Sequence, residues 1–230
     1  MNESGIDLPY CYAYPHPAAT TDVVVFSLRN DRLVALLVKR GNPPFEGMWA
    51  LPGGFLDIDE DLDTCAKREL QEETGITGIY LEQLYTFGRP GRDPRERVIS
   101  VAYFALVPAH DLVRPRAASD ARAARWFETD ELPSLAFDHA QIIELARQRL
   151  VSKLQYSTIA FQLLPRAFTL SEVQRVYETL LREPLDKRNF RKRLAALDLL
   201  EPTGEARRNG NHRPAREYRL RNPGTVEFTK

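Results

Sequence analysis

The stretch Gly54–Ile76, GFLDIDEDLDTCAKRELQEETGI, decides how the first part of the chain folds. Within it, Leu62–Thr74 predicts an α-helix, because Asp61 can cap its start and Gly75 can end it. The segment before the helix is rich in Gly and Pro and predicts a loop.

Three glutamates of this helix, Glu69, Glu72 and Glu73, fall within an arc of roughly 100°. They continue an apolar stripe from the preceding turns, which indicates that this face points inward; a solvated acidic face is the alternative. Clustered, partly buried carboxylates need a compensating charge. Oxygen-only ligands suit Mg²⁺ or Mn²⁺, so the helix predicts a divalent metal site. Arg68 lies beside Glu72 on the helix and can hold a carboxylate in place.

The spacing of the stretch resembles the Nudix hydrolase signature at each defined position, and the lead-in at residues 49–54, WALPGG, is also similar to that family. The resemblance implies helices sandwiching a mixed sheet over roughly residues 15–150. It also implies metal-assisted hydrolysis of a nucleoside diphosphate linked to another group. The general base varies in this superfamily, and Asp120 and Glu128 are later candidates. The implied site comprises Gly54, Glu60 (through water), Arg68 (orienting the acids), and the metal ligands Glu69, Glu72, Glu73 and the Gly53 carbonyl.

Runs of β-branched and apolar residues predict the strands of this part. They are expected at Asp22–Leu28, Leu33–Lys39, Ile79–Phe87 and Val98–Leu106, with a short strand at Arg125–Glu128 and a helix at Asp138–Leu154. The order of strands and helices predicts the α+β class, with a mixed sheet covered by helices.

Arginines gather in the loop between the strands expected at Ile79–Phe87 and Val98–Leu106, and Arg40 ends an earlier strand. The planar guanidinium group of arginine can bind a phosphate, a ribose or an adenine, although a solvated basic loop explains the same pattern. The segments 92–95 and 135–139 resemble the Nudix branch linked to ADP-ribose and NAD metabolism. We interpret His139 as a residue at the start of a helix whose ring nitrogens form local hydrogen bonds, rather than as a catalytic residue. The expected ligand-binding arginines are Arg40, Arg89, Arg92 and Arg95.

Charge divides the chain into two parts. The net charge is zero, yet residues 151–230 hold 16 Lys and Arg against 9 Asp and Glu. We expect a domain at residues 1–150 and a second domain at residues 151–230, whose basic charge suits a polyanion, although a merely solvated surface explains the same charge. The chain has 2 cysteines and no long apolar run. We therefore expect no disulfide framework, no signal peptide, no membrane partner and a cytoplasmic location.

The second part predicts a winged helix-turn-helix. Thr169 and Glu172 form a capping box before one helix, Asp186 caps a second that runs to about Leu199, and Asn209-Gly210 signals a hairpin. The second helix has an apolar face and a basic face, which suits double-stranded DNA, although mere packing is the alternative. The expected DNA contacts are Lys187, Arg188, Arg191, Lys192, Arg207, Arg208 and Arg213.

This part resembles the C-terminal domain of the Nudix-related transcriptional regulators, the NrtR family, through residues 168–173, 185–191 and 213–218. The resemblance implies a homodimer on a palindromic operator and an ADP-ribose-like effector. Many members have lost residues of the Nudix signature, whereas the signature at Gly54–Ile76 of this chain is complete. Three hypotheses stay open: a regulator that senses the nucleotide, a Mg²⁺-dependent pyrophosphohydrolase with an accessory domain, and a basic module for RNA or another protein.

Overall fold

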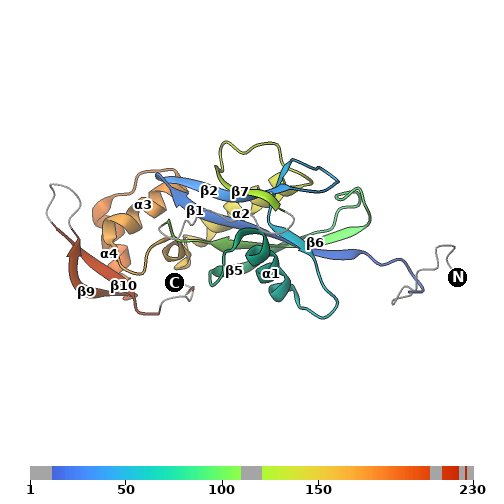
Figure 1. The fold of residues 1–230 in the computed structure, drawn as a ribbon. Helices are drawn as coiled ribbons and strands as arrows, with labels where there is room; N and C mark the ends of the chain where they lie inside the picture. Colours follow the sequence, from blue (N-terminus) through green and yellow to red (C-terminus); the bar gives the residue numbers. More distant parts are fainter. Residues whose placement is uncertain (1–11, 110–120, 208–213, 223–225, 227–230) are drawn as a thin grey trace.

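The structure, a computed structural model, describes residues 12–109, 121–207, 214–222 and 226 (Figure 1). The first part contains β1 Ala18–Arg29, β2 Arg32–Arg40, β3 Trp49–Ala50, β4 Gly53–Phe55, α1 Leu62–Thr74, β5 Tyr80–Phe87, β6 Val98–Leu106, β7 Ala121–Glu128 and α2 His139–Lys153. Among the described residues the strands form one mixed sheet. Its order is β3-β2-β1-β6-β5, with β4 paired to β1 and β7 to β2. β1 runs parallel to β6 and antiparallel to β2 and β4.

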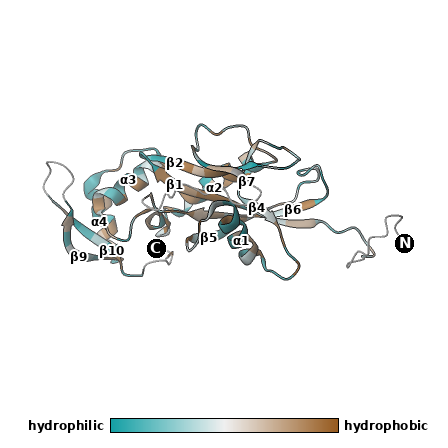
Figure 2. Ribbon diagram, viewed as in Figure 1, coloured by the Kyte–Doolittle hydropathy of each residue, from teal (hydrophilic) through white to brown (hydrophobic). Residues whose placement is uncertain are grey.

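Alternating side chains of β1 serve the two faces of the sheet, as the pleat requires. Val23 and Val25 pack with Ala66 and Leu70 of α1, whereas Phe26 belongs to the larger core that includes α2. Figure 2 shows the apolar colour along β1 and β2 and the polar colour on the outer side of α1. The predicted α+β sandwich with a mixed sheet is confirmed.

The turn between β1 and β2 consists of Asn30 and Asp31, both left-handed with φ of 51° and 57°. Such a two-residue turn matches the twist of a hairpin, and Asn and Asp tolerate this conformation. β1 begins at Ala18 rather than at Asp22, because pairing with β6 starts at Ala18 opposite Val98. The apolar run alone did not reveal this extension, because residues 18–21 are not part of it.

The second part contains the 3₁₀ helix η2 Ile159–Leu163, β8 Phe168–Thr169, α3 Leu170–Leu181, α4 Lys187–Ala196, β9 Leu200–Arg207 and β10 Ala215–Leu220. Within the described range its strands are ordered β8-β10-β9. The capping box at the start of α3 is present, and Asp186 accepts from the Asn189 amide at 2.8 Å. Two helices followed by a hairpin confirm the predicted winged helix; its predicted turn, Asn209-Gly210, lies outside the described residues.

A continuous apolar core joins the two parts. Leu150 of α2, Phe161 of η2, Val173 of α3 and Leu194 of α4 belong to the same buried cluster. The winged-helix part lies at the end of the sheet away from the N-terminus (Figure 1). The proposed division at residue 150 stays a prediction. Within the described residues, no helix combines the length and apolarity that crossing a membrane requires.

Candidate functional site

A pocket of about 450 Å³ opens along the C-terminal half of α1, at the start of α2 and along β4. Its walls come from β1, β2, β4, α1, the loop after β5 and the start of α2, so the fold gathers segments that are far apart in the sequence. Of the residues predicted for the site, Glu60 and Arg89 are absent from the wall. The predicted residues that do line it are Arg40, Gly53, Gly54, Arg68, Glu69, Glu72, Glu73, Arg92 and Arg95.

The glycines of β4 create the room for the acidic side chains. A Cβ at Gly54 would lie 2.2 Å from Oε1 of Glu69, inside any permitted contact. A Cβ at Gly53 would lie 2.1 Å from the carbonyl oxygen of Thr21 on β1. The backbone of β1 therefore leaves room only for glycine at Gly53, whereas a Cβ at Gly54 would displace the carboxylate of Glu69. Gly54 thus leaves the space that the Glu69 carboxylate occupies.

α1 orients the acids as the sequence predicted. Asp61 accepts from the Thr64 amide at 2.8 Å, and Gly75 ends the helix in the left-handed conformation with φ of 75°. Cys65 and Leu70 are buried on the side of α1 that faces the sheet. The helix is thereby fixed at both ends and along one face, so its glutamates have a defined direction.

Arg68 organises the acids by binding several of them. Its guanidinium donates to Glu60 at 3.0 Å and 2.5 Å, and to Glu69 at 2.7 Å. A longer contact of 3.3 Å reaches Glu72. The hydrogen bond from Arg68 lowers the pKa of Glu60 to about 2. Glu60 thus lies beside the pocket, where it holds Arg68 in place.

Glu73 is the most perturbed acid of the site. Its Oε2 accepts from the Gly53 amide at 3.0 Å, and the carboxylate has no ion pair among the described residues. Burial, together with the charges of Glu69 and Asp22, raises the pKa of Glu73 to about 8, against the opposing Gly53 amide. Burial also raises the pKa of Glu69. Two neighbouring carboxylates that are costly to ionise form a site that favours an added cation.

The donor chemistry of the pocket fits a divalent metal ion. No three carboxylate, imidazole or thiol groups of the described residues converge into a ready-made cage. Even so, Glu69 and Glu73 present carboxylate oxygens to one pocket and repel each other, which a cation would offset. Oxygen donors of this kind suit Mg²⁺ or Mn²⁺. The residues present therefore fit the predicted metal, with Glu72 at the exposed edge.

The arginines of the predicted ligand set have different surroundings. Arg92 is 4% exposed; it donates to Asp138 at 3.0 Å and 2.6 Å and lies 3.4 Å from Asp22. Burial opposes its charge, but the hydrogen bond to Asp138 and the charge of Asp22 raise the pKa of Arg92. Arg95 is 39% exposed and pairs with Asp93. Arg89 is exposed and outside the pocket wall.

A buried polar network forms the floor of the pocket, and the sequence interpretation missed its extent. Nδ1 of His139 accepts from the Leu51 amide at 2.8 Å, so the ring is neutral with its proton on Nε2, 3.4 Å from Asp22. Complete burial lowers the pKa of His139. Ser100 donates to the other oxygen of Asp22. Polar Asp22 within the apolar run of β1 was the available signal for this network.

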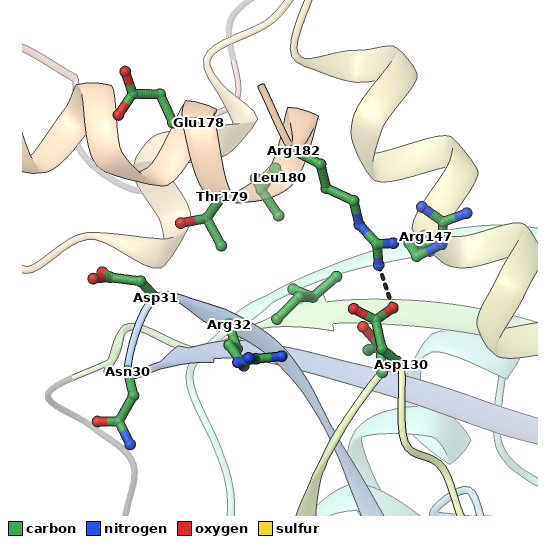
Figure 3. A pocket seen from close by; sticks show the side chains of 11 residues that line it. Asn30, Asp31, Arg32, Asp130, Arg147, Glu178, Thr179, Leu180 and Arg182 are labelled. Atoms are coloured by element: carbon green, nitrogen blue, oxygen red, sulfur yellow. Dashed lines mark hydrogen bonds and ion pairs between the residues drawn. The ribbon is translucent and has the colours of Figure 1, made fainter. Parts of the chain in front are cut away.

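A second pocket, of about 370 Å³, lies between the two parts of the chain (Figure 3). The turn between β1 and β2 contributes Asp31, the segment after β7 contributes Asp130, and the end of α3 contributes Arg182. Arg182 pairs with Asp130 across it, and Arg175 approaches Asp31 at 3.7 Å. The charges here are already paired and exposed, so this pocket is a contact between modules and carries no acid cluster for chemistry.

The winged-helix part has basic side chains on the exposed face of α4. Phe190 and Leu194 of α4 are buried, while the predicted DNA contacts Lys187, Arg188, Arg191 and Lys192 are exposed. Arg207 differs, because its guanidinium is bound to Glu217 at 2.6 Å and to Glu172 at 3.1 Å. Arg208 and Arg213 lie outside the described residues. α4 thus has an exposed basic face, and Arg207 links β9 to β10 and to the start of α3.

Comparison with known proteins identifies two domain families in this chain. Residues 18–146 match the model of the NUDIX domain, and residues 160–220 match that of the NrtR DNA-binding winged helix domain. Over 211 residues the chain is 38% identical to the ADPR responsive transcriptional repressor NtrR of Acinetobacter baylyi, covering 90% of this chain and 83% of that protein. An ADP-ribose pyrophosphatase of Methanocaldococcus jannaschii is 39% identical over 138 residues, covering 60% of this chain and 78% of that protein.

A solved structure extends the similarity to the arrangement of both domains. The Shewanella oneidensis NrtR complexed with a 27mer DNA is 39% identical and superposes with a TM-score of 0.77. The match covers 88% of this chain and 93% of that one. Both the nucleotide-type pocket and the basic helix described above therefore lie within one shared architecture.

Proposed function

The chain belongs to the NrtR family of Nudix-domain regulators, and on that premise we propose that it is a transcriptional repressor that responds to ADP-ribose. The Nudix domain binds the nucleotide, and the winged helix binds double-stranded DNA. One observation carries the proposal: a single chain joins a complete acidic pocket to an exposed basic helix through one continuous core.

The DNA-binding role rests on the composition of α4. Its exposed basic side chains can neutralise phosphates, and a helix of this kind fits the major groove. Phe190 and Leu194 fix the opposite face in the core, so the basic face has a defined orientation. We propose that two copies of the chain bind a palindromic site together, each placing one α4 in a groove. This dimer and a cytoplasmic location remain predictions.

The nucleotide-binding role rests on the charge pattern of the pocket. A diphosphate would lie between the cationic rim, with Arg40 and Arg95, and the acids Glu69 and Glu73 of α1. Glu69 and Glu73 would hold Mg²⁺ or Mn²⁺, with the Gly53 carbonyl and Glu72 in support. When bound, such an ion neutralises phosphate charge and activates water. Arg68 keeps the acids in position through its hydrogen bond to Glu69.

DNA binding is tested by fluorescence anisotropy of promoter DNA, with and without ADP-ribose. The double variant Arg191→Ala, Lys192→Ala is expected to bind more weakly and to lower the slope of log K against log salt by about 1 per lost phosphate contact. The control is Arg29→Ala, Lys67→Ala, which removes equal charge from exposed positions outside the winged helix. An unchanged slope in the α4 variant contradicts its role as the DNA-reading helix.

Hydrolysis is a second function, favoured by the signature residues that line one pocket: Gly54, Arg68, Glu69, Glu72 and Glu73. Water would cleave the diphosphate bond of ADP-ribose to give AMP and ribose 5-phosphate. The test is product analysis after incubation with ADP-ribose and Mg²⁺. Glu73→Gln keeps the volume of the side chain but removes its charge, so we expect loss of hydrolysis with DNA affinity largely retained. Hydrolysis at an undiminished rate in this variant contradicts the assignment.

A further inference from the structure

Two arginines of α4 are directed toward the body of the winged-helix domain. The guanidinium of Arg191 approaches the hydroxyl of Ser171 on α3 at 3.5 Å. The guanidinium of Arg193 donates to the carbonyl oxygen of Gln155, just after α2, at 2.9 Å. Both acceptors belong to segments outside α4. These two arginines therefore mark the margins of the exposed face of the helix.

The middle of that face follows from the buried side of α4. Phe190 packs edge-on against an aromatic ring of α3, with ring centroids 5.2 Å apart, and Leu194 is buried one turn later. At about 100° per residue, the direction opposite these two side chains passes through Lys192, with Arg188 and Asn189 within roughly 60° of it. The two arginines at the margins lie roughly 100° from it. The middle of the exposed face thus differs from its margins.

The side chains in the middle of the face are available to a partner. Arg188, Asn189 and Lys192 are exposed, and among the described residues their side chains have no hydrogen bond or ion pair. The next turn of the same face carries the exposed Ala195 and Ala196, whose small side chains allow close approach to a groove. α4 has five cations and no acid, so nothing on the helix repels a phosphate backbone.

Asn189 is the exception among the exposed polar side chains of α4, because it carries no charge. It favours a helix less than Lys, Arg or Ala does. The cap is already made by Asp186, whose carboxylate accepts from the backbone amide of Asn189, so the Asn189 side chain is not needed for capping. Its carboxamide has a donor beside an acceptor, which matches N7 and N6 of adenine in the major groove.

We propose that Asn189 determines the DNA sequence that the protein recognises, by contacting an adenine, and that Arg188 contacts a guanine in a neighbouring base pair. Both lie in the first turn of α4, and this turn of a recognition helix is the one that contacts base edges. An arginine guanidinium matches O6 and N7 of guanine. Lys187 and Lys192 then bind phosphates. The assignment rests on the proposed function, since α4 must first lie in the groove, and it adds the side chains that set the sequence.

The test is selection of bound duplexes from a library with a randomised central segment, followed by sequencing. The full-length wild type is compared with Asn189→Ala and Arg188→Ala. The matched control is Arg193→Ala, which removes a cation from the margin of the same helix, where its guanidinium is bound to the Gln155 carbonyl. Fluorescence anisotropy then measures the affinity for the selected duplex and for duplexes with single base-pair changes.

We expect the wild type to prefer one adenine in each half-site by about tenfold over other bases, and Asn189→Ala to lose this preference at that position alone. Arg188→Ala should lose a preference for guanine nearby, and Arg193→Ala should keep both. The thermal midpoint of Asn189→Ala should match or exceed that of the wild type, because alanine favours the helix.

A modified base tests the adenine contact directly. Replacing that adenine by 7-deazaadenine removes the N7 acceptor and keeps the base pair. Binding by the wild type should weaken about fivefold, whereas Asn189→Ala should bind both duplexes equally. If the modified base weakens both proteins to the same extent, Asn189 does not contact it, and the inference is overturned.

The selection also separates this inference from the proposed function. If the wild type enriches no sequence, the proposed DNA-binding function is wrong and the assignment of Asn189 is wrong with it. If the wild type and Asn189→Ala enrich the same sequence, the proposed function stands and the assignment is overturned. If Asn189→Ala binds every duplex more weakly by the same factor, Asn189 supports the helix or a phosphate contact, which also overturns it.

Discussion

Removing the guanidinium of Arg92 should lower the free energy of unfolding of the Nudix domain, although Arg92 lies in a loop. Arg92 is 4% exposed and neutralises Asp138 through two hydrogen bonds and Asp22 at 3.4 Å. In Arg92→Met the methionine fills much of the volume, but two buried carboxylates lose their counter-charge. Breaking a buried pair in this way costs about 3–5 kcal/mol. For a domain of this size the loss lowers the thermal midpoint by about 10 °C.

The measurement is thermal and urea unfolding at pH 7.5, followed by circular dichroism. Arg89→Met, an exposed residue of the same loop, should change stability by less than about 0.5 kcal/mol. A loss below about 1 kcal/mol for Arg92→Met at pH 7.5 would refute the reasoning.

Further predictions concern Gly54, Arg207 of the winged helix, and the ion pair between Arg182 and Asp130. Gly54→Ala places a Cβ 2.2 Å from Glu69, so any hydrolysis of ADP-ribose should fall by about 100-fold in a product assay while DNA affinity is retained. Arg207→Gln should lower the thermal midpoint yet keep the salt slope of DNA binding, since its guanidinium is bound to glutamates; a slope lower by about 1 would show a phosphate contact. Arg182→Asp and Asp130→Arg should each weaken the response of DNA binding to ADP-ribose by up to about fivefold, and the double variant should restore it, because the ion pair forms again with its charges exchanged. If the two losses add in the anisotropy assay, this ion pair does not transmit the response.

Local patterns predicted the elements that depend on neighbouring residues. The cap at Asp61, the stop at Gly75 and the capping box at Thr169 each involve residues a few positions apart, and the structure has all of them. The extension of β1 to Ala18 depends on its partner Val98, which is far away in the sequence. Periodicity within one strand carries no information about such a partner. The sequence therefore predicted the fold class better than the strand bounds.

The arginines show why a site is harder to predict than a fold. By composition Arg40, Arg92 and Arg95 are equivalent ligand candidates, and all three line the pocket. Asp138 and Asp22 bind Arg92 within the floor, where its side chain is 4% exposed. Arg95 pairs with Asp93, and 39% of its side chain stays exposed. The difference comes from acids on other elements, and it determines which cation is available to a ligand. Charge pattern thus identifies where an anion would bind, but only the three-dimensional pairing of each arginine indicates whether it binds the ligand or supports the wall.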